Sequence, residues 1–241
     1  MEKADIDKIQ SKLAKMIKLQ EGAEKIGSLE EAAAAAAMVQ TLLLKYNLEM
    51  SDLDLGKEAP PTTNDVLDLS EVYGWNKSSG PWMISLINTL SRHNLCGIVQ
   101  LKRFNSNNQP VMAIRVFGKR ENIDAVLMLS SQLIHRLKEM VKVSWKSYEG
   151  YEKKNTYMRG YLTGAVTGIG VKLAENQIEI EKANIGMTAL MVTSDKVIKS
   201  AIEDFYKGGL KSSTNKRLKG TGGLQNGFRD GKNMSINKAI K

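Results

Sequence analysis

GIVQLKRFNSNNQPVMAIRVFG, residues 97–118, is the clearest structural pattern in the sequence. Two short runs rich in β-branched and aromatic residues, GIVQLKRF and VMAIRVFG, flank the sequence NSNNQP. Asn and Pro at this spacing are typical of the turn of a β-hairpin, and Gly118 ends the second run. Residues 97–118 are therefore expected to form two antiparallel strands.

Helical patterns lie on both sides of this hairpin. Before it, Pro81 stands near a helix start, where its missing amide proton is harmless. After it, residues 121–147 repeat apolar side chains with a helical period. The order helix, strand, strand, helix predicts an α+β fold, with a short antiparallel sheet packed by helices on one face. The side chains expected to be buried are Trp82, Ile84, Ile87 and Leu90 before the hairpin, and Ile123, Val126, Leu127, Leu133, Ile134, Leu137 and Val141 after it.

The following segment is predicted to be helical over residues 156–176, although it contains Gly160, Gly164 and Gly168 on one face. Each glycine in a helix interior costs about 1 kcal/mol relative to alanine. Close packing against another backbone is the natural way to offset that cost. The run MTALMVTS, residues 187–194, then predicts a third strand. Ser194 or Asp195 is expected to cap a helix that reaches Tyr206.

The N-terminal part is expected to form a separate unit. Residues 1–50 predict a helical hairpin, because two helical patterns are joined by a short turn that contains glycine. Residues 51–74 are acidic, hold Pro60 and Pro61, and predict a linker with a short strand near residues 66–69. Residues 75–241 are the predicted C-terminal α+β domain. A helical hairpin buries little surface alone, so it is expected to dock on the rest of the chain or on a second copy.

The positive charge of the chain is concentrated at one end. The formal net charge is +9. Residues 207–241 hold nine Lys or Arg and one acid, Asp230, whereas the preceding 206 residues hold 26 bases and 25 acids. A localised positive field attracts polyanions such as nucleic acid, nucleotides or an acidic protein. The alternative is a basic tail that only increases solubility.

The segment KGGLKSSTNKRLKGTGGLQNGFRDGK, residues 207–232, is rich in both glycine and basic residues. Its Lys and Arg side chains would neutralise phosphates, and its glycines would let backbone amides approach them. We therefore predict a basic, glycine-rich phosphate-binding loop over residues 207–232. The residues expected to contact phosphate are Lys207, Lys211, Ser213, Lys216, Arg217, Lys219, Arg229 and Lys232.

Composition favours a cytoplasmic protein. Apolar residues make up 42% and charged residues 25%, and no run of 18 apolar residues predicts a membrane span. The start MEKADIDKIQ lacks an apolar signal core, so secretion is not expected. Cys96 is the single cysteine, which rules out an internal disulfide and fits a reducing compartment. A protein encoded by a phage would function in the host cytoplasm.

No enzyme signature is found in the sequence, which contains neither a GxxxxGK[ST] loop nor an HExxH motif. His93, His135 and Cys96 make a poor set of zinc ligands. We therefore predict no catalytic residue, no metal and no cofactor. A hydrolase that uses acidic residues outside any known motif is kept as a third hypothesis.

Residues 5–48 resemble the family called domain of unknown function 2786. Its pattern is a K-L-L-A-L-A-like run, E-A-x-x-A, and A-Q-x-L-x-x-K-Y/H-N/G-L, which correspond here to Lys15–Leu19, Glu31–Ala35 and Val39–Leu48. Later segments resemble the region that follows it in that family, and they read GWNKSSGPWMISLINTLSRHNLC, VFGKRENIDAVLMLSSQL, YMRGYLTGAVTGIGVKL and FRDGKNMSINKAI. The resemblance implies a bacterial or bacteriophage protein. It also implies that Gly227, Gly231 and Ser235 belong to a folded region.

The function predicted from these features is that of a non-enzymatic, phage-type accessory protein that binds nucleic acid. No recognition helix is evident, so it is expected to contact phosphates with little sequence preference. The alternative is a phage anti-defence protein that sequesters a nucleotide signal or masks a host protein. The stretches Ala32–Ala37 and Gly160–Gly168 could also support association of two or more copies.

Overall fold

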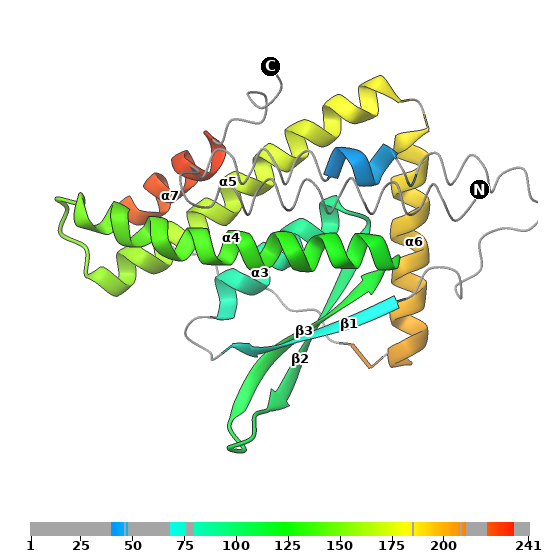
Figure 1. Ribbon diagram of the computed structural model, residues 1–241, viewed down its shortest axis with the longest axis horizontal. Helices are drawn as coiled ribbons and strands as arrows, with labels where there is room; N and C mark the ends of the chain where they lie inside the picture. The colour runs from blue at the N-terminus through cyan, green and yellow to red at the C-terminus, as the bar shows by residue number, and fades with distance from the viewer. Residues whose placement is uncertain are drawn as a thin grey trace, which may run out of the picture.

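The fold is described from a computed structural model, which covers residues 40–45, 47, 80–184, 186–207, 209–210 and 221–233, and the backbone of residues 68–75. In these ranges a three-stranded antiparallel sheet lies against several helices (Figure 1). The α+β class predicted from the sequence is confirmed. The strands are β1 (Asp68–Trp75), β2 (Cys96–Phe104) and β3 (Pro110–Gly118), and the helices are α3 (Gly80–His93), α4 (Arg120–Lys146), α5 (Lys154–Ala183), α6 (Met187–Tyr206) and α7 (Gly222–Lys232).

β3 is the central strand of the sheet, whose order is β1-β3-β2. It pairs with β2 along its whole length, as the predicted hairpin requires. It pairs with β1 from Asp68, opposite Gly118, to Trp75, opposite Met112. The short strand expected near residues 66–69 is therefore a longer edge strand. Residues 68–74 of the predicted linker belong to the sheet. Pairing with β3 stabilises this strand, whereas its acidic sequence gives little local indication of it.

Alternate residues of the hairpin face different helices. Ile98, Ile114 and Val116 belong to the main core, which includes buried residues of α3, α4 and α5. Val99 and Phe117 point to the opposite side of the sheet, because successive side chains of a strand alternate, and they pack with residues of α6. The expectation of a sheet covered on one face is thus incomplete, since α6 covers part of the second face.

The buried sides of α3 and α4 lie where the helical spacing predicts them. All four apolar residues predicted for α3 are buried, and five of the seven predicted for α4 are buried. The other two, Leu127 and Ile134, are half-buried and pack against the same core. Both helices pack on α5 as well as on the sheet, so the main core lies between the sheet and α5.

The strand predicted over residues 187–194 is wrong, because these residues form the first turns of α6. Ser194 and Asp195 lie inside this helix and do not cap it. A short apolar run with β-branched residues fits a strand and a helix turn equally well, so composition alone misassigned it. The helical spacing is visible in the buried and half-buried residues, which include Met187, Leu190, Met191, Ile198, Ala201 and Ile202.

Only the end of the predicted N-terminal helical hairpin lies within the described residues. Residues 40–45 and 47 are helical and dock on the chain itself. Asn176 Nδ2 donates a hydrogen bond to Gln40 Oε1 at 2.9 Å, and Asn47 Nδ2 donates one to Asn122 Oδ1 at 3.0 Å. The rest of this hairpin, including Ala32–Ala37, lies outside the described residues. Among the described helices, none is both long enough and apolar enough to cross a membrane.

Candidate nucleic-acid interface

The last eleven residues of the predicted glycine-rich loop form a helix, α7. Thr221 caps it, since its Oγ1 accepts a hydrogen bond from the Leu224 amide at 3.1 Å. The Glu152 carboxylate accepts a second hydrogen bond from the Gly222 amide. The prediction of a loop over all of residues 207–232 is therefore corrected for Gly222–Lys232. Four glycines make this helix intrinsically poor, so a tertiary contact must stabilise it.

That contact is a pair of glycine faces on α5 and α7. Gly160, Gly164 and Gly168 face the backbone of α7, and a Cβ atom at Gly168 would lie 2.6 Å from both the Lys232 amide nitrogen and the Phe228 carbonyl oxygen. The close backbone contact predicted for these glycines is confirmed. The stretch Gly160–Gly168, which the sequence also offers for self-association, is occupied by α7. On the other helix, Gly223, Gly227 and Gly231 face the backbone of Tyr157, Tyr161 and Ala165.

Hydrogen bonds between side chains lock the same two helices. Tyr161 donates its hydroxyl to Asp230 Oδ2 at 2.8 Å, and Asn226 Nδ2 donates to the Tyr157 hydroxyl at 3.0 Å. Burial, followed by the hydrogen bond to the Asp230 carboxylate, raises the pKa of Tyr161. The phenol therefore stays protonated and keeps donating. These side chains hold α7 in place, so α7 is an integral part of the fold.

Three of the eight predicted phosphate-binding residues lie within the described ranges. Lys207 directly follows α6, adopts a left-handed conformation with φ of 48° and is exposed. Arg229 and Lys232 are exposed on α7. Arg229 Nε lies 3.4 Å from Asp230 Oδ1, and Lys232 Nζ lies 3.8 Å from Glu175 Oε1. Such exposed ion pairs are weak. The other five, Lys211, Ser213, Lys216, Arg217 and Lys219, lie outside the described residues.

The three described residues are not gathered at one place. α6, which Lys207 follows, and α7, which carries Arg229 and Lys232, lie on opposite sides of the molecule (Figure 1). One compact phosphate loop built from all eight residues is therefore not supported. The basic surface has at least two parts, one at the end of α6 and one on the outer face of α7.

A second basic stretch was not predicted from the sequence. Residues 72–120 contain seven Lys or Arg and neither Asp nor Glu. They include α3, the β2–β3 hairpin and the start of α4. The signal was available from the sequence, but it appears only when charge is counted over windows of this length. Over the first 206 residues as a whole, the acids of other segments cancel the positive charge of this stretch.

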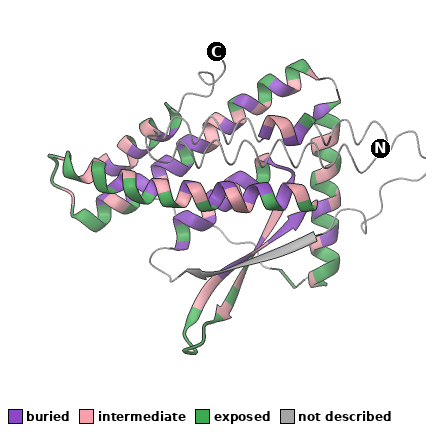
Figure 2. Ribbon diagram, viewed as in Figure 1, coloured by how far each residue is buried: buried purple, intermediate pink, exposed green. Residues whose placement is uncertain are grey.

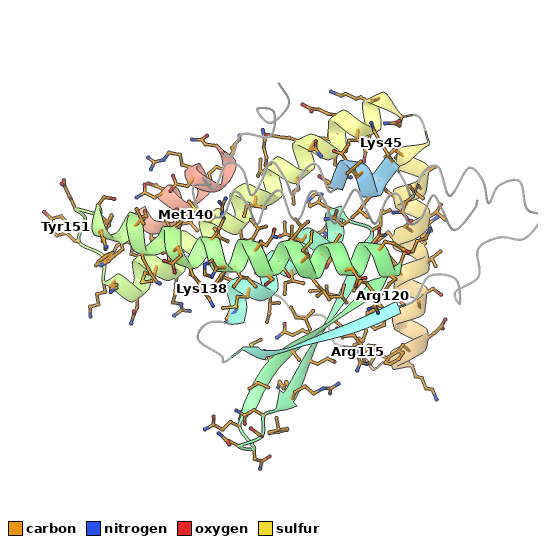
Figure 3. All side chains as sticks on the ribbon, viewed as in Figure 1. Lys45, Arg115, Arg120, Lys138, Met140 and Tyr151 are labelled. Atoms are coloured by element: carbon orange, nitrogen blue, oxygen red, sulfur yellow. The ribbon has the colours of Figure 1, made fainter. Side chains whose placement is uncertain are left out.

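The hairpin and the end of α6 meet at Arg115 (Figure 3). Arg115 Nη1 donates a hydrogen bond to the Tyr206 hydroxyl at 3.1 Å. Its guanidinium also lies over the rings of Phe205 and Tyr206, at 5.0 and 5.9 Å from their centroids. Lys207 follows Tyr206 directly, so the chain leaves α6 beside the hairpin. The acid-free stretch 72–120 thus adjoins the start of a second acid-free stretch, residues 205–229, which contains six Lys or Arg.

The weak metal-ligand set found in the sequence is not assembled. No three His, Cys, Asp or Glu residues are placed to hold a metal ion within the described part of the chain. His93 Nδ1 donates to Gln177 Oε1 at 2.9 Å, because Gln177 uses its amide nitrogen to bind Glu181. Burial lowers the pKa of His93 and raises the pKa of the Cys96 thiol. The hydrogen bond of His93 and the burial of Cys96 fit a structural role for both side chains.

No family model matches the chain, and neither a curated protein nor a solved structure matches it. The resemblance of residues 5–48 to domain of unknown function 2786 stays a prediction.

Proposed function

We propose that the protein binds nucleic acid through phosphate contacts with little sequence preference. The observation that carries the proposal is the contact of Arg115 with Tyr206, which joins the acid-free stretch 72–120 to the start of the second acid-free stretch, residues 205–229. Between them these stretches hold thirteen Lys or Arg. Stretches of positive charge without acidic residues attract polyanions and release the counterions of their phosphates.

The described part of the interface fits contact with the nucleic-acid backbone rather than recognition of bases by a helix. Lys207, Arg229 and Lys232 are exposed and basic. Arg229 contacts the half-exposed Asp230, and Lys232 contacts the exposed Glu175. Phosphate contacts position a protein on nucleic acid but carry no sequence information directly. The protein would therefore act as an accessory factor, and a phage origin is part of this proposal.

The test is the salt dependence of binding to labelled DNA and RNA, measured by fluorescence anisotropy between about 50 and 200 mM salt. Four to six phosphate contacts give a slope of log K against log salt of about −3 to −5. The variant with Lys211, Lys216, Arg217 and Lys219 changed to Glu should lose most of the affinity.

The matched control changes four exposed lysines elsewhere to Glu, with the same change in net charge. These lysines are Lys138, Lys146, Lys153 and Lys154, on α4 and at the start of α5. A flat salt response, or an equal loss of affinity in the control, would contradict the proposal. If a cyclic nucleotide at micromolar concentration raised the melting temperature while neither DNA nor RNA bound, the anti-defence alternative would be favoured instead.

A further inference from the structure

The outer half of the β2–β3 hairpin projects away from the helices (Figure 1). Its surface is exposed from Lys102 through the turn to Pro110, apart from the half-buried Arg103 (Figure 2). Phe104 is the last residue of β2, and 68% of its surface is exposed. A large aromatic ring is therefore presented to solvent at the end of a basic strand.

Lys102 and Phe104 lie on the same face of β2, because residues two apart in a strand point to the same side. Their partners across the strand pair are Met112 and Pro110. Both strands belong to the acid-free stretch 72–120, so neither of them contains a carboxylate. This face combines an ammonium group and an aromatic ring without a nearby acid in either strand.

The turn that follows Phe104 is held in one conformation. Asn105 Oδ1 accepts hydrogen bonds from the Asn107 amide at 3.0 Å and from the Gln109 amide at 2.8 Å. Asn108 has φ of 55°, a left-handed conformation that Asn adopts more readily than most residues. The end of the hairpin is thus ordered before any ligand binds, which reduces the entropy lost on binding.

Protection of the sheet edge does not explain this surface. A lysine on an edge strand discourages pairing with another chain, and β2 is an edge strand. An exposed phenylalanine has the opposite effect, because it adds apolar surface to the same edge. Lys102 and Phe104 together would suit a ligand that is anionic and also has flat, apolar faces.

We propose that Phe104 stacks on an unpaired base of a single-stranded nucleic acid, while Lys102 neutralises a neighbouring phosphate. Proteins that bind single strands combine basic surfaces with aromatic side chains on which bases stack. In a duplex the faces of the bases are already stacked on one another, so the ring favours single strands. This inference rests on the proposed nucleic-acid binding and adds the class of nucleic acid.

The experiment measures the affinity of the full chain for a labelled single strand and for a duplex of the same length. Phe104→Ala should weaken binding of the single strand by about 5- to 150-fold, the range expected for one lost base stack. Duplex affinity should stay unchanged. Phe104→Trp should retain the affinity for the single strand, since indole also stacks. Tyr151→Ala is the matched control, because Tyr151 is a fully exposed aromatic residue on the turn between α4 and α5 (Figure 3).

A second variant tests the charge separately. Lys102→Gln should reduce the slope of log K against log salt by about 0.7 for a single strand, as expected for one lost phosphate contact. Far-ultraviolet circular dichroism should show that both hairpin variants stay folded, because Lys102 and Phe104 are exposed.

The outcomes separate the two proposals. If the wild type binds with the expected salt dependence but Phe104→Ala leaves single-strand affinity unchanged, the stacking inference is overturned and the proposed function stands. If neither a single strand nor a duplex binds, both fail. If Phe104→Ala changes the monomer–dimer equilibrium and not the affinity, the hairpin edge joins copies of the chain, and the inference is again overturned.

Discussion

The hydroxyl of Tyr161 donates a hydrogen bond to Asp230 Oδ2 at 2.8 Å, which joins α5 to α7 beside their glycine faces. Tyr161 is fully buried, whereas the Asp230 side chain keeps 28% of its surface exposed. Hydrogen bonds to charged groups contribute about 1.5–3 kcal/mol. We expect Tyr161→Phe to lower the free energy of unfolding by this amount, measured by chemical denaturation.

Tyr151→Phe is the control for that measurement, because it removes the same hydroxyl from a fully exposed tyrosine. Its free energy of unfolding should match that of the wild type. An equal loss in the two variants would mean that the bond to Asp230 does not stabilise the fold.

The glycine contact predicts a larger effect from a single methyl group. A Cβ atom at Gly164 would overlap the Leu224 carbonyl oxygen and would lie 2.8 Å from the Phe228 amide nitrogen. Backbone atoms cannot move aside by changing rotamer, so Gly164→Ala should cost at least about 2 kcal/mol. Amide hydrogen exchange over residues 222–232 should become faster, because α7 is forced away from α5.

Gly170→Ala is the matched control on the same helix. A Cβ atom at Gly170 would meet only a side-chain atom, Thr89 Cγ2, at 3.2 Å. Alanine also favours the helix by about 1 kcal/mol relative to glycine. This variant should be close to wild-type stability with normal exchange in α7. Comparable damage from the two substitutions would contradict the assigned role of the Gly164 face.

The surroundings of His93 predict a loss of stability in mild acid. Burial is the main cause that lowers the pKa of His93 in the folded state, the nearby charge of Arg92 lowers it further, and the hydrogen bond with Gln177 partly opposes them. Below about pH 6.5 the unfolded chain therefore binds more protons than the folded chain. The free energy of unfolding should fall as the pH decreases through this range.

His93→Gln should make this part of the pH profile flatter. His135→Gln is the control, since it removes a histidine that is exposed on α4 and leaves His93 in place. An unchanged profile in His93→Gln would show that other groups control stability in mild acid.

The junction between the hairpin and α6 should tolerate lysine poorly at Arg115. Lysine keeps the charge but loses the planar group that lies over Phe205 and Tyr206 and donates to the Tyr206 hydroxyl. We expect Arg115→Lys to cost about 1–2 kcal/mol of stability. Arg159→Lys, at an exposed position of α5, should be neutral in the same thermal and chemical unfolding experiments.

Much of the fold could be predicted because local pattern and tertiary packing agree there. The turn residues and flanking strands specify the β2–β3 hairpin, and the spacing of Trp82, Ile84, Ile87 and Leu90 specifies the buried side of α3. In α5 the repeated glycines predict a close backbone contact, because an isolated helix would be weakened by them.

The errors arise where packing overrides local preference. Gly222–Lys232 is helical although its glycines favour a loop, since α5 offers a face that only glycine can approach so closely. Gly223, Gly227 and Gly231 recur every four residues, and this helical spacing is the sequence pattern that could have predicted α7. The role proposed for Phe104 could not be predicted from the sequence, because its exposure depends on how far the hairpin projects beyond the helices.

The pairing of α5 with α7 also has a consequence for biosynthesis. Tyr161 and Asp230 are 69 positions apart, so α5 is synthesised well before the helix that covers it. The glycine face of α5 therefore lacks its contact with α7 until residues 222–232 have left the ribosome. We expect nascent chains that stop before Gly222 to be recognised by chaperones and cut by proteases within α5, whereas chains released after α7 resist both.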